Sequence, residues 1–202
     1  MTAEETCLRY GHHRPGHLWR HLMADMKHYL EASGQGGLRL GAMKKASVFL
    51  RPEIQCLTLH RIAHALHAGG HPWWARRVAG LNRLVHRVTL TPQSCIGPGL
   101  RLPHPAGVAF HGRAGEGVTL FSRAVCWAAG PLLDAPGPAA AGPVLGDRVT
   151  IGGQAAVLGA VAVGADTVVS PKSIVTADTP AGALVFAAGH RPRRSRREAA
   201  AG

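Results

Sequence analysis

Residues 145–175 read LGDRVTIGGQAAVLGAVAVGADTVVSPKSIV, and this stretch decides the fold. Every sixth residue is aliphatic: Leu145, Ile151, Val157, Val163, Val169 and Val175. The residue four positions further on is small or β-branched, namely Val149, Ala155, Val161, Thr167 and Ser173. A period of six fits neither an α-helix nor the simple alternation of a strand. It predicts a solenoid whose coil has flat sides, in which each rung points one aliphatic side chain inward.

The same step occurs upstream. The inward positions expected there are Leu90, Ile96, Leu102, Val108, Ala114 and Leu120. The residue four positions later is usually small or β-branched, as at Ser94, Ala106, Gly112, Val118 and Ala124. The two blocks are out of phase, because the step from Leu120 to Leu145 is not a multiple of six. The intervening segment 128–142 is rich in Pro, Ala and Gly, so we expect a loop ejected from one corner. Both a functional loop and a tolerated surface insertion remain open.

The residues before this array have helical periodicity. Apolar residues fall at helical spacing from Leu18 to Leu30, from Pro52 to Leu66 and from Trp73 to Val88, with Gly or Pro between these segments. We therefore divide the chain into an α-helical N-terminal region at 1–88, a β-solenoid domain at 89–189 and a basic tail at 190–202 that we expect to be disordered.

Charge and cysteine content limit the function classes. The chain of 202 residues has a formal net charge of +12, which favours anionic partners without choosing among nucleic acid, an acidic membrane and a phosphorylated small molecule. Five arginines cluster in the tail, at Arg191, Arg193, Arg194, Arg196 and Arg197, but no aromatic residue interleaves them, so nucleic-acid binding through the tail is the weaker alternative.

The cysteines indicate the compartment. Cys7, Cys56, Cys95 and Cys126 are widely spaced and form no CxxC pair, so we expect neither a metal site nor a disulfide framework. No apolar run approaches the roughly 20 residues of a membrane span, and the N-terminus lacks a signal-peptide pattern. These features favour a cytoplasmic protein with reduced thiols and no membrane partner.

Several segments together resemble one enzyme family. His60–His64 (HRIAH), Leu81–Leu84 (LNRL), Ile96–Val108 (IGPGLRLPHPAGV) and the closing coils from Ile151 to Gly182 are similar to those of the serine O-acetyltransferases, which are hexapeptide-repeat acyltransferases. The resemblance covers roughly Pro52 to Gly189. It implies a mainly β protein, a left-handed parallel β-helix preceded by helices, that uses acetyl-CoA as co-substrate and forms a homotrimer or a dimer of trimers.

The resemblance also implies site residues. It places the family's general base, which deprotonates the acceptor hydroxyl for direct attack on the thioester, at His104 in the motif PHPAG. Thr89 stands where the family has a supporting carboxylate, and Pro103 stands where it has an acidic residue. Where the family has a second His with an adjacent Arg, this chain has Ala141 and Gly142.

These replacements weaken the serine-binding signature. The expected acceptor is therefore an amino acid or amino alcohol that need not be serine, contacted by Thr89, Arg101, His111 and Arg113. Acetyl-CoA is expected along Ala128, Gly153, Ala155, Pro171 and Lys172, although Trp127 occupies a position where the family has Gly. The alternative is a catalytically silent hexapeptide-repeat protein that binds or scaffolds a partner.

Overall fold

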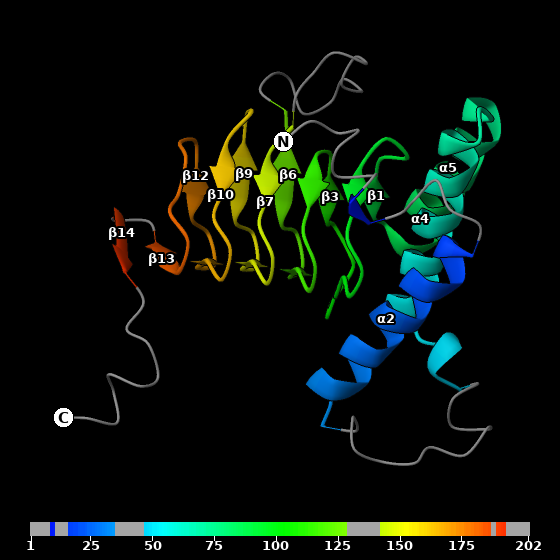
Figure 1. Ribbon diagram of the computed structural model, residues 1–202, viewed down its shortest axis with the longest axis horizontal. Coiled ribbons are helices and arrows are strands. Elements are labelled where there is room, and N and C mark those ends of the chain that lie inside the picture. Colours follow the sequence, from blue (N-terminus) through cyan, green and yellow to red (C-terminus); the bar gives the residue numbers. More distant parts are fainter. Residues whose placement is uncertain (1–8, 11–15, 35–46, 129–141, 187–188, 193–202) are drawn as a thin grey trace.

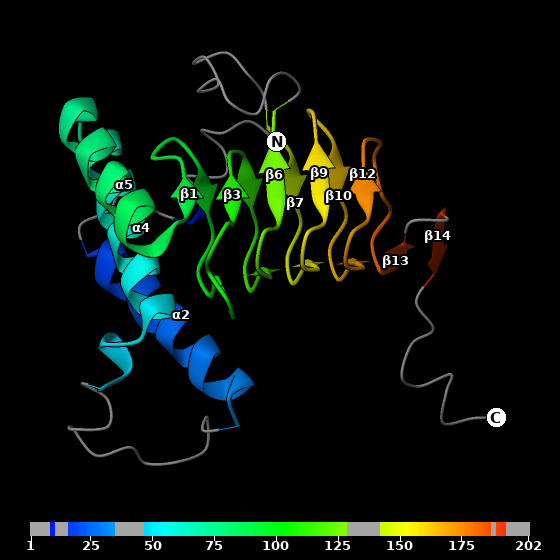
Figure 2. The same cartoon turned by 180° about the vertical axis from the view of Figure 1, so that it is seen from behind.

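The computed structural model describes residues 9–10, 16–34, 47–128, 142–186 and 189–192. Three helices, α2 (His17–Ala32), α4 (Pro52–Ala68) and α5 (Pro72–His86), precede the first strand, close to the expected positions. They pack against one end of a long coiled array of strands (Figure 1). Seen from behind (Figure 2), the coils run from β1 beside these helices to β13 and β14 at the far end. None of the helices in the described residues is long and apolar enough to cross a bilayer.

The array is a left-handed parallel β-helix with three sheets, as predicted. Sheet A contains β1 (Thr89–Leu90), β3 (Ala109–Phe110), β6 (Val125–Trp127), β9 (Ala156–Leu158) and β12 (Ile174–Val175). Sheet B contains β2 (Cys95–Ile96), β4 (Arg113–Ala114), β7 (Val144–Leu145) and β10 (Ala162–Val163). Sheet C contains β5 (Thr119–Leu120), β8 (Thr150–Ile151), β11 (Val168–Val169), β13 (Ala183–Phe186) and β14 (Gly189–Pro192), of which only β13 and β14 pair antiparallel.

The predicted inward residues form the core. All twelve are buried in one hydrophobic cluster, and the first block continues one step further, to Cys126, which pairs with Val157 in sheet A. The coils approach so closely that some corners admit only glycine. A Cβ added at Gly146 would lie 2.6 Å from the backbone nitrogen of Ala165, closer than any real contact. Spacing of the rungs at about 4.8 Å therefore explains part of the high glycine content.

One detail of the predicted register is wrong. Arg101 bridges Thr119 and Phe110 pairs with Cys126, so eight positions separate Leu102 from Phe110 where six separate Leu120 from Cys126. The turn that contains His104 therefore holds two extra residues.

The next corner compensates, because only four positions separate Phe110 from Ala114. Phe110, not Val108, is thus the inward residue of β3, although Val108 is also buried. Ala106 is exposed and Gly112 is half-buried, so neither fills the small-residue position expected of it.

A buried ion pair joins the helices to the first coil. Asp25 of α2 and Arg61 of α4 are 0% and 3% exposed, and the guanidinium donates two hydrogen bonds of 3.0 Å to the carboxylate. Arg61 also donates to the carbonyl oxygens of Ile96 and Gly97, while the backbone N–H of Leu100 donates to Asp25 at 2.8 Å. Every charge in this cluster is thus partnered, as burial requires.

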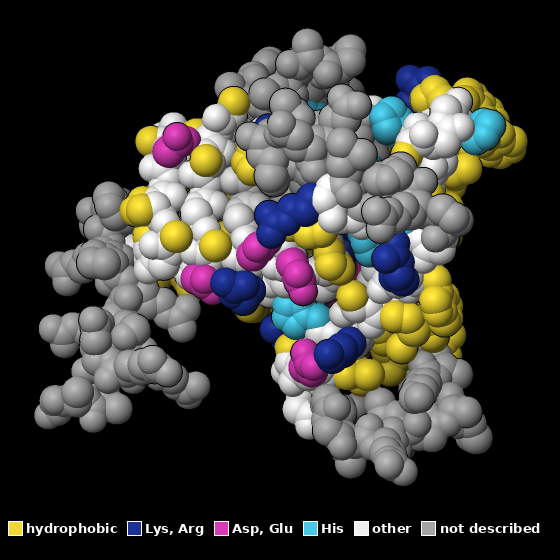
Figure 3. Space-filling view, in the orientation of Figure 1, with side chains coloured by type: hydrophobic (Ala, Val, Ile, Leu, Met, Phe, Trp, Pro, Cys, Tyr) yellow, Lys and Arg dark blue, Asp and Glu magenta, His cyan; other side chains and the backbone are white. Residues whose placement is uncertain are grey.

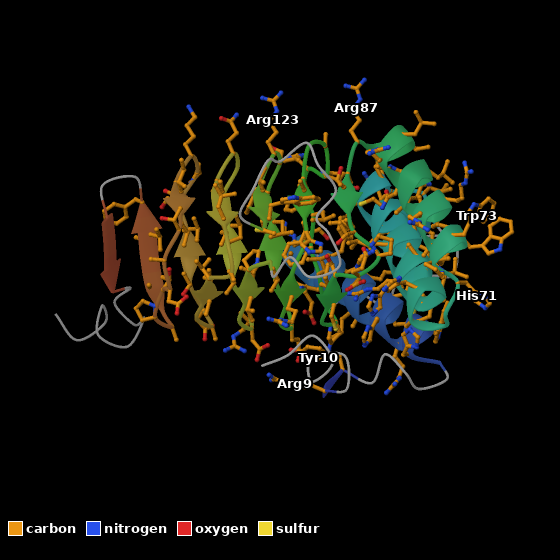
Figure 4. The ribbon with its side chains drawn as sticks, turned by 90° about the horizontal axis from the view of Figure 1, so that it is seen from above. Arg9, Tyr10, His71, Trp73, Arg87 and Arg123 are labelled. Atoms are coloured by element: carbon orange, nitrogen blue, oxygen red, sulfur yellow. The ribbon has the colours of Figure 1, made fainter. Side chains whose placement is uncertain are left out.

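The described N-terminal residues are attached to a middle coil. Tyr10 donates its hydroxyl to Asp147 at 3.1 Å, and Arg9 lies 3.3 Å from the same carboxylate (Figure 4). Partial burial raises the pKa of the Asp147 carboxyl, but hydrogen bonds from the Glu116 backbone and Tyr10, together with Arg9, outweigh it and leave that pKa below its usual value. This carboxylate therefore helps to hold the chain's start against the β-helix.

Candidate active site

His104 lies on the edge where sheet C turns into sheet A. We define the C–A edge as the turns 103–108, 121–124, 152–155 and 170–173, one for each successive coil. Backbone hydrogen bonds join these turns: Arg123 N–H to Ala106 O at 3.2 Å, Gln154 N–H to Ser122 O at 3.0 Å and Lys172 N–H to Gly153 O at 3.0 Å. The His104 side chain is exposed on this edge. The turns thus form one continuous line that begins at His104.

Most of the residues predicted to hold acetyl-CoA lie on the same edge. Gly153, Ala155, Pro171 and Lys172 occupy the second and third turns after that of His104, within about 14 Å along the axis at 4.8 Å per coil. Ala155 is fully buried, backbone included, so one copy of the chain does not expose it to a ligand. Gly153 is half-buried, and Pro171 and Lys172 are exposed on this edge.

The C–A edge is also cationic. Arg87, Arg123 and Lys172 have φ values of 56°, 58° and 63°, a left-handed conformation that costs a non-glycine residue roughly 1 kcal/mol. Figure 4 shows Arg87 and Arg123 projecting from the same edge of the β-helix. The four turns of the edge contain no acidic residue. Phosphate groups of a bound cofactor would therefore meet uncompensated positive charge there.

Thr89 borders the turn of His104. Its backbone N–H donates to Val108 O at 2.9 Å, and Gly107 N–H donates to Arg87 O at 2.8 Å, so the first strand lies directly beside this turn. Thr89 occupies the position that carries a carboxylate in the family that the sequence resembles. This position thus lies beside the turn of His104, but here it holds a hydroxyl. A hydroxyl can orient an imidazole without offering the full charge that stabilises an imidazolium.

His111 lies on a different edge, where sheet A turns into sheet B. Thr91 Oγ1 is 2.9 Å from His111 Nδ1 and 2.7 Å from Ser94 Oγ, and the His111 ring is 5.6 Å from that of Trp127. Ala128, predicted to contact acetyl-CoA, is buried at the end of β6 on this A–B edge and not with the other predicted contacts. The predicted site residues therefore divide between two edges of sheet A.

The two predicted arginines are on other faces. Arg101 bridges to sheet C and Arg113 is in β4 of sheet B; both are half-buried, and their Nε atoms have no hydrogen-bond partner among the described residues. Of the predicted acceptor contacts, Thr89 alone lies beside the turn of His104 within the described part of one chain. Ala141 lies outside the described residues, as do Cys7 and most of the basic tail.

Gly142 excludes a side chain. A Cβ at this position would collide with the carbonyl oxygen of His111. A side chain therefore has no room there along this backbone path, so this corner does not admit a histidine or an arginine at Gly142.

The thiols of the described core are unsuited to nucleophilic catalysis. Cys56 and Cys126 are fully buried, and burial raises the pKa of each thiol to about 12. Within the described ranges, no group of three or more His, Cys, Asp or Glu side chains could hold a metal ion. The arrangement offers an exposed imidazole, backbone donors and cations.

A cavity that the sequence did not predict lies between α5 and the first coil. Its volume is about 300 Å³, and its walls include Arg76 and Arg83 of α5 as well as Thr89 and Thr91. The spacing of the two arginines, seven residues apart on a helix, was the available signal, since such residues share one face.

Comparison with known proteins points to one family. No family model matches the chain. A serine acetyltransferase of Helicobacter pylori strain J99 is 32% identical over 143 residues, which cover 70% of this chain and 81% of that protein. One from Mycobacterium tuberculosis is 29% identical over 140 residues, which cover 68% of this chain and 59% of that protein.

Solved structures agree on the fold. The serine acetyltransferase of Neisseria gonorrhoeae in complex with serine superposes with a TM-score of 0.73 at 23% identity, covering 89% of this chain and 70% of that one. Isoform 3 from Entamoeba histolytica, in complex with cysteine, gives a TM-score of 0.70 at 19% identity, covering 91% of this chain and 63% of that one.

Proposed function

This chain belongs to the serine acetyltransferase family of acetyl-CoA-dependent acyltransferases, and from that premise we propose that His104 is the general base that deprotonates the acceptor hydroxyl. The acceptor is a small amino acid or amino alcohol. The observation that carries this proposal is the continuous C–A edge, on which an exposed imidazole is followed by small residues and by Lys172. Imidazole suits the role because it takes up and returns a proton near neutral pH.

The proposed reaction is direct transfer. His104 takes the proton of the acceptor hydroxyl while that oxygen forms a bond to the thioester carbonyl carbon. The carbon–sulfur bond then breaks, and the imidazolium returns the proton to the departing thiolate. Buried thiols with raised pKa values support a route without a covalent enzyme intermediate. Gly153, Pro171 and Lys172 are the residues that we assign to acetyl-CoA, with the cation toward its phosphates.

We further propose that the acceptor differs from serine. Thr89 supplies no negative charge to the imidazolium, and the corner at Gly142 has no room for a histidine. Both departures affect the residues that the family pattern assigns to the base and to the substrate. An acceptor recognised by other groups accounts for both.

We infer that a second copy of the chain completes the site. His104 and His111 lie at opposite edges of sheet A, on the C–A edge and the A–B edge. We therefore propose a homotrimer in which the C–A edge of one subunit faces the A–B edge of the next.

Helix α5 supports a further doubling of the trimer. Apolar side chains are exposed on one face of this helix, at Trp73, Trp74, Leu81, Leu84 and Val85, with exposed fractions of 49% to 80%. Figure 3 shows hydrophobic side chains gathered over the helical end of the molecule. Contiguous patches of this kind mark interfaces between proteins, and the same face on a second copy is its simplest complement.

Turnover of acetyl-CoA tests the function. Release of the CoA thiol would be measured with L-serine, other hydroxy amino acids and amino alcohols, for the wild type and for His104→Ala, with the exposed His71→Ala as a matched control. We expect turnover with at least one acceptor, its loss in His104→Ala and its retention in His71→Ala. Full activity of His104→Ala would remove His104 from the base role.

The same measurement addresses the second candidate, a catalytically silent binding or scaffold protein, which Thr89 and Gly142 favour. No turnover with any acceptor, together with retained binding of CoA, would support it. We place the protein in the cytoplasm, because buried reduced cysteines suit a reducing compartment.

A further inference from the structure

The cavity between α5 and the first coil has the chemistry of an anion site. On one wall, Arg76 and Arg83 lie seven residues apart on α5, two helical turns or about 10 Å along the axis. The opposite wall is formed by Thr89, Leu90, Thr91, Pro92 and Gln93, of which Thr89, Thr91 and Gln93 have hydrogen-bonding side chains. No acidic residue lines the cavity, and no ion pair joins either arginine to a carboxylate within the described residues. Two cations thus face neutral hydrogen-bonding groups.

Small residues keep the cavity open. Ala79 and Gly80 lie between the two arginines on the same helical face, and a Cβ built at Gly80 meets no atom within 4 Å. Glycine inside a helix costs about 1 kcal/mol relative to alanine. No neighbouring atom requires a glycine at this position, so close packing does not explain the choice of Gly80.

The opposite wall is oriented by its neighbours. Thr91 Oγ1 lies 2.7 Å from Ser94 Oγ and 2.9 Å from His111 Nδ1, and Ser94 also accepts a hydrogen bond from the backbone N–H of Gly112 at 3.2 Å. These contacts hold the Thr91 hydroxyl at the cavity wall. A bound oxyanion would therefore find a hydroxyl already in place, at little cost in side-chain entropy.

The cavity also borders the proposed catalytic centre. Thr89 belongs to its lining and, through the hydrogen bond of its N–H to Val108 O, lies beside the turn of His104. Thr89 therefore lies between the cavity and the turn of His104. A volume of about 300 Å³ is at the lower end of small-molecule sites and exceeds what a hydroxymethyl group needs.

We propose that this cavity binds an oxyanion, a phosphate or a carboxylate, and that in the reaction it holds the anionic group of the acceptor. The binding of an oxyanion stands independently, whereas the role of the cavity in holding the acceptor rests on the proposed acetyl transfer. Arg76 and Arg83 make charge-assisted hydrogen bonds to the anion, and Thr91 and Gln93 complete its coordination. The acceptor is accordingly a hydroxy compound that carries a carboxylate or a phosphate, which favours a hydroxy amino acid over an amino alcohol.

Binding is tested first, without turnover. Inorganic phosphate and acetate would be titrated separately into the full chain at constant ionic strength, with binding followed by NMR of the arginine Nε–H groups. We expect Arg76→Ala, Arg83→Ala and Gly80→Leu each to weaken binding of the preferred anion at least tenfold. Gly80→Leu fills the cavity while it improves helix propensity, so loss of binding in this variant does not report unfolding.

The control is Arg77→Ala, which removes one positive charge from an exposed position of α5 outside the lining. It should change the dissociation constant less than twofold. Equal weakening by Arg77→Ala and Arg83→Ala would show attraction to the overall charge and overturn the proposal, as would binding of neither anion.

Pairs of acceptors then test whether the cavity holds the anionic group of the acceptor. Glycerol 3-phosphate is compared with glycerol, and L-serine with L-serinamide, so that each pair differs in its phosphate or carboxylate. We expect one anionic member to be the better acceptor by at least tenfold in kcat/KM, with the preference lost in Arg83→Ala. Turnover without such a preference would refute only the role of the cavity in holding the acceptor. Absence of turnover with intact, arginine-dependent anion binding would refute the acetyl transfer and leave the anion site standing.

Discussion

Breaking the Asp25–Arg61 pair should destabilise the protein more than any surface substitution. Arg61→Leu leaves the carboxylate of Asp25, which is 0% exposed, with only the Leu100 N–H as a partner, and it also removes the donors to Ile96 O and Gly97 O. Removing one partner of a buried pair costs about 3 to 5 kcal/mol. In a chain of 202 residues, this corresponds to a fall in Tm of about 6 to 20 °C.

The assay is urea unfolding followed by circular dichroism, at one fixed chain concentration so that any assembly contributes equally. Asp25→Leu and the double variant complete a cycle, in which we expect a coupling of about 2 to 3 kcal/mol. The control is the surface pair Lys27–Glu31, whose side chains are 77% and 53% exposed and where Lys27→Leu should cost no more than about 0.5 kcal/mol. A loss below about 1 kcal/mol for Arg61→Leu, or simple additivity in the cycle, would refute this account of the junction.

Three further results are expected. Burial raises the thiol pKa values of Cys56 and Cys126 to about 12, so both should escape alkylation by iodoacetamide at pH 8 in the native protein and react after unfolding. Peptide mass spectrometry would measure the labelling, and rapid labelling of the native protein would contradict their burial. The lowered pKa of Asp147 stabilises the fold above the unfolded carboxyl value of about 4. This contribution should be lost as the pH falls through the folded value, so Asp147→Asn should flatten the acid limb of the stability curve measured by urea unfolding. Leu84→Glu, on the exposed face of α5, should halve the particle mass measured by light scattering if that face doubles the trimer, and an unchanged mass would exclude this interface.

The sequence predicted the solenoid because its evidence is local and repeated. Each of the two phases of the six-residue step marks the buried side of a rung, and the twelve side chains so identified do form the core. The phase change also predicts a loop ejected at 128–142; residues 129–141 lie outside the described structure, so this loop stays a prediction.

The register around His104 could not be read in the same way. Two extra residues in its turn are cancelled by two fewer at the corner of His111, so the count of six continues to fall on an aliphatic residue, Val108. The signal was the bulky Phe110, which fits a rung better than a corner. A turn lengthened at the position of the proposed base remained invisible to periodicity.

The junction and the anion cavity were missed for another reason. Asp25 lies three residues after Leu22 on the apolar face of its helix, where an acid calls for a partner, but the sequence does not say which of many cations supplies it. Arg76 and Arg83 share a helical face by spacing, yet the wall opposite them depends on how α5 packs against the first coil. Contacts between distant segments are tertiary information.

The central claim is that an imidazole on the C–A edge acts as the base for acetyl transfer. Its most direct test is kcat for the best acceptor, measured with saturating acetyl-CoA for the wild type, His104→Ala and His71→Ala, with the acetylated product identified by mass spectrometry. The account predicts that His104→Ala lowers kcat by about 10² to 10⁴, with the KM for acetyl-CoA within about twofold and His71→Ala at the wild-type rate. Wild-type kcat in His104→Ala would contradict it.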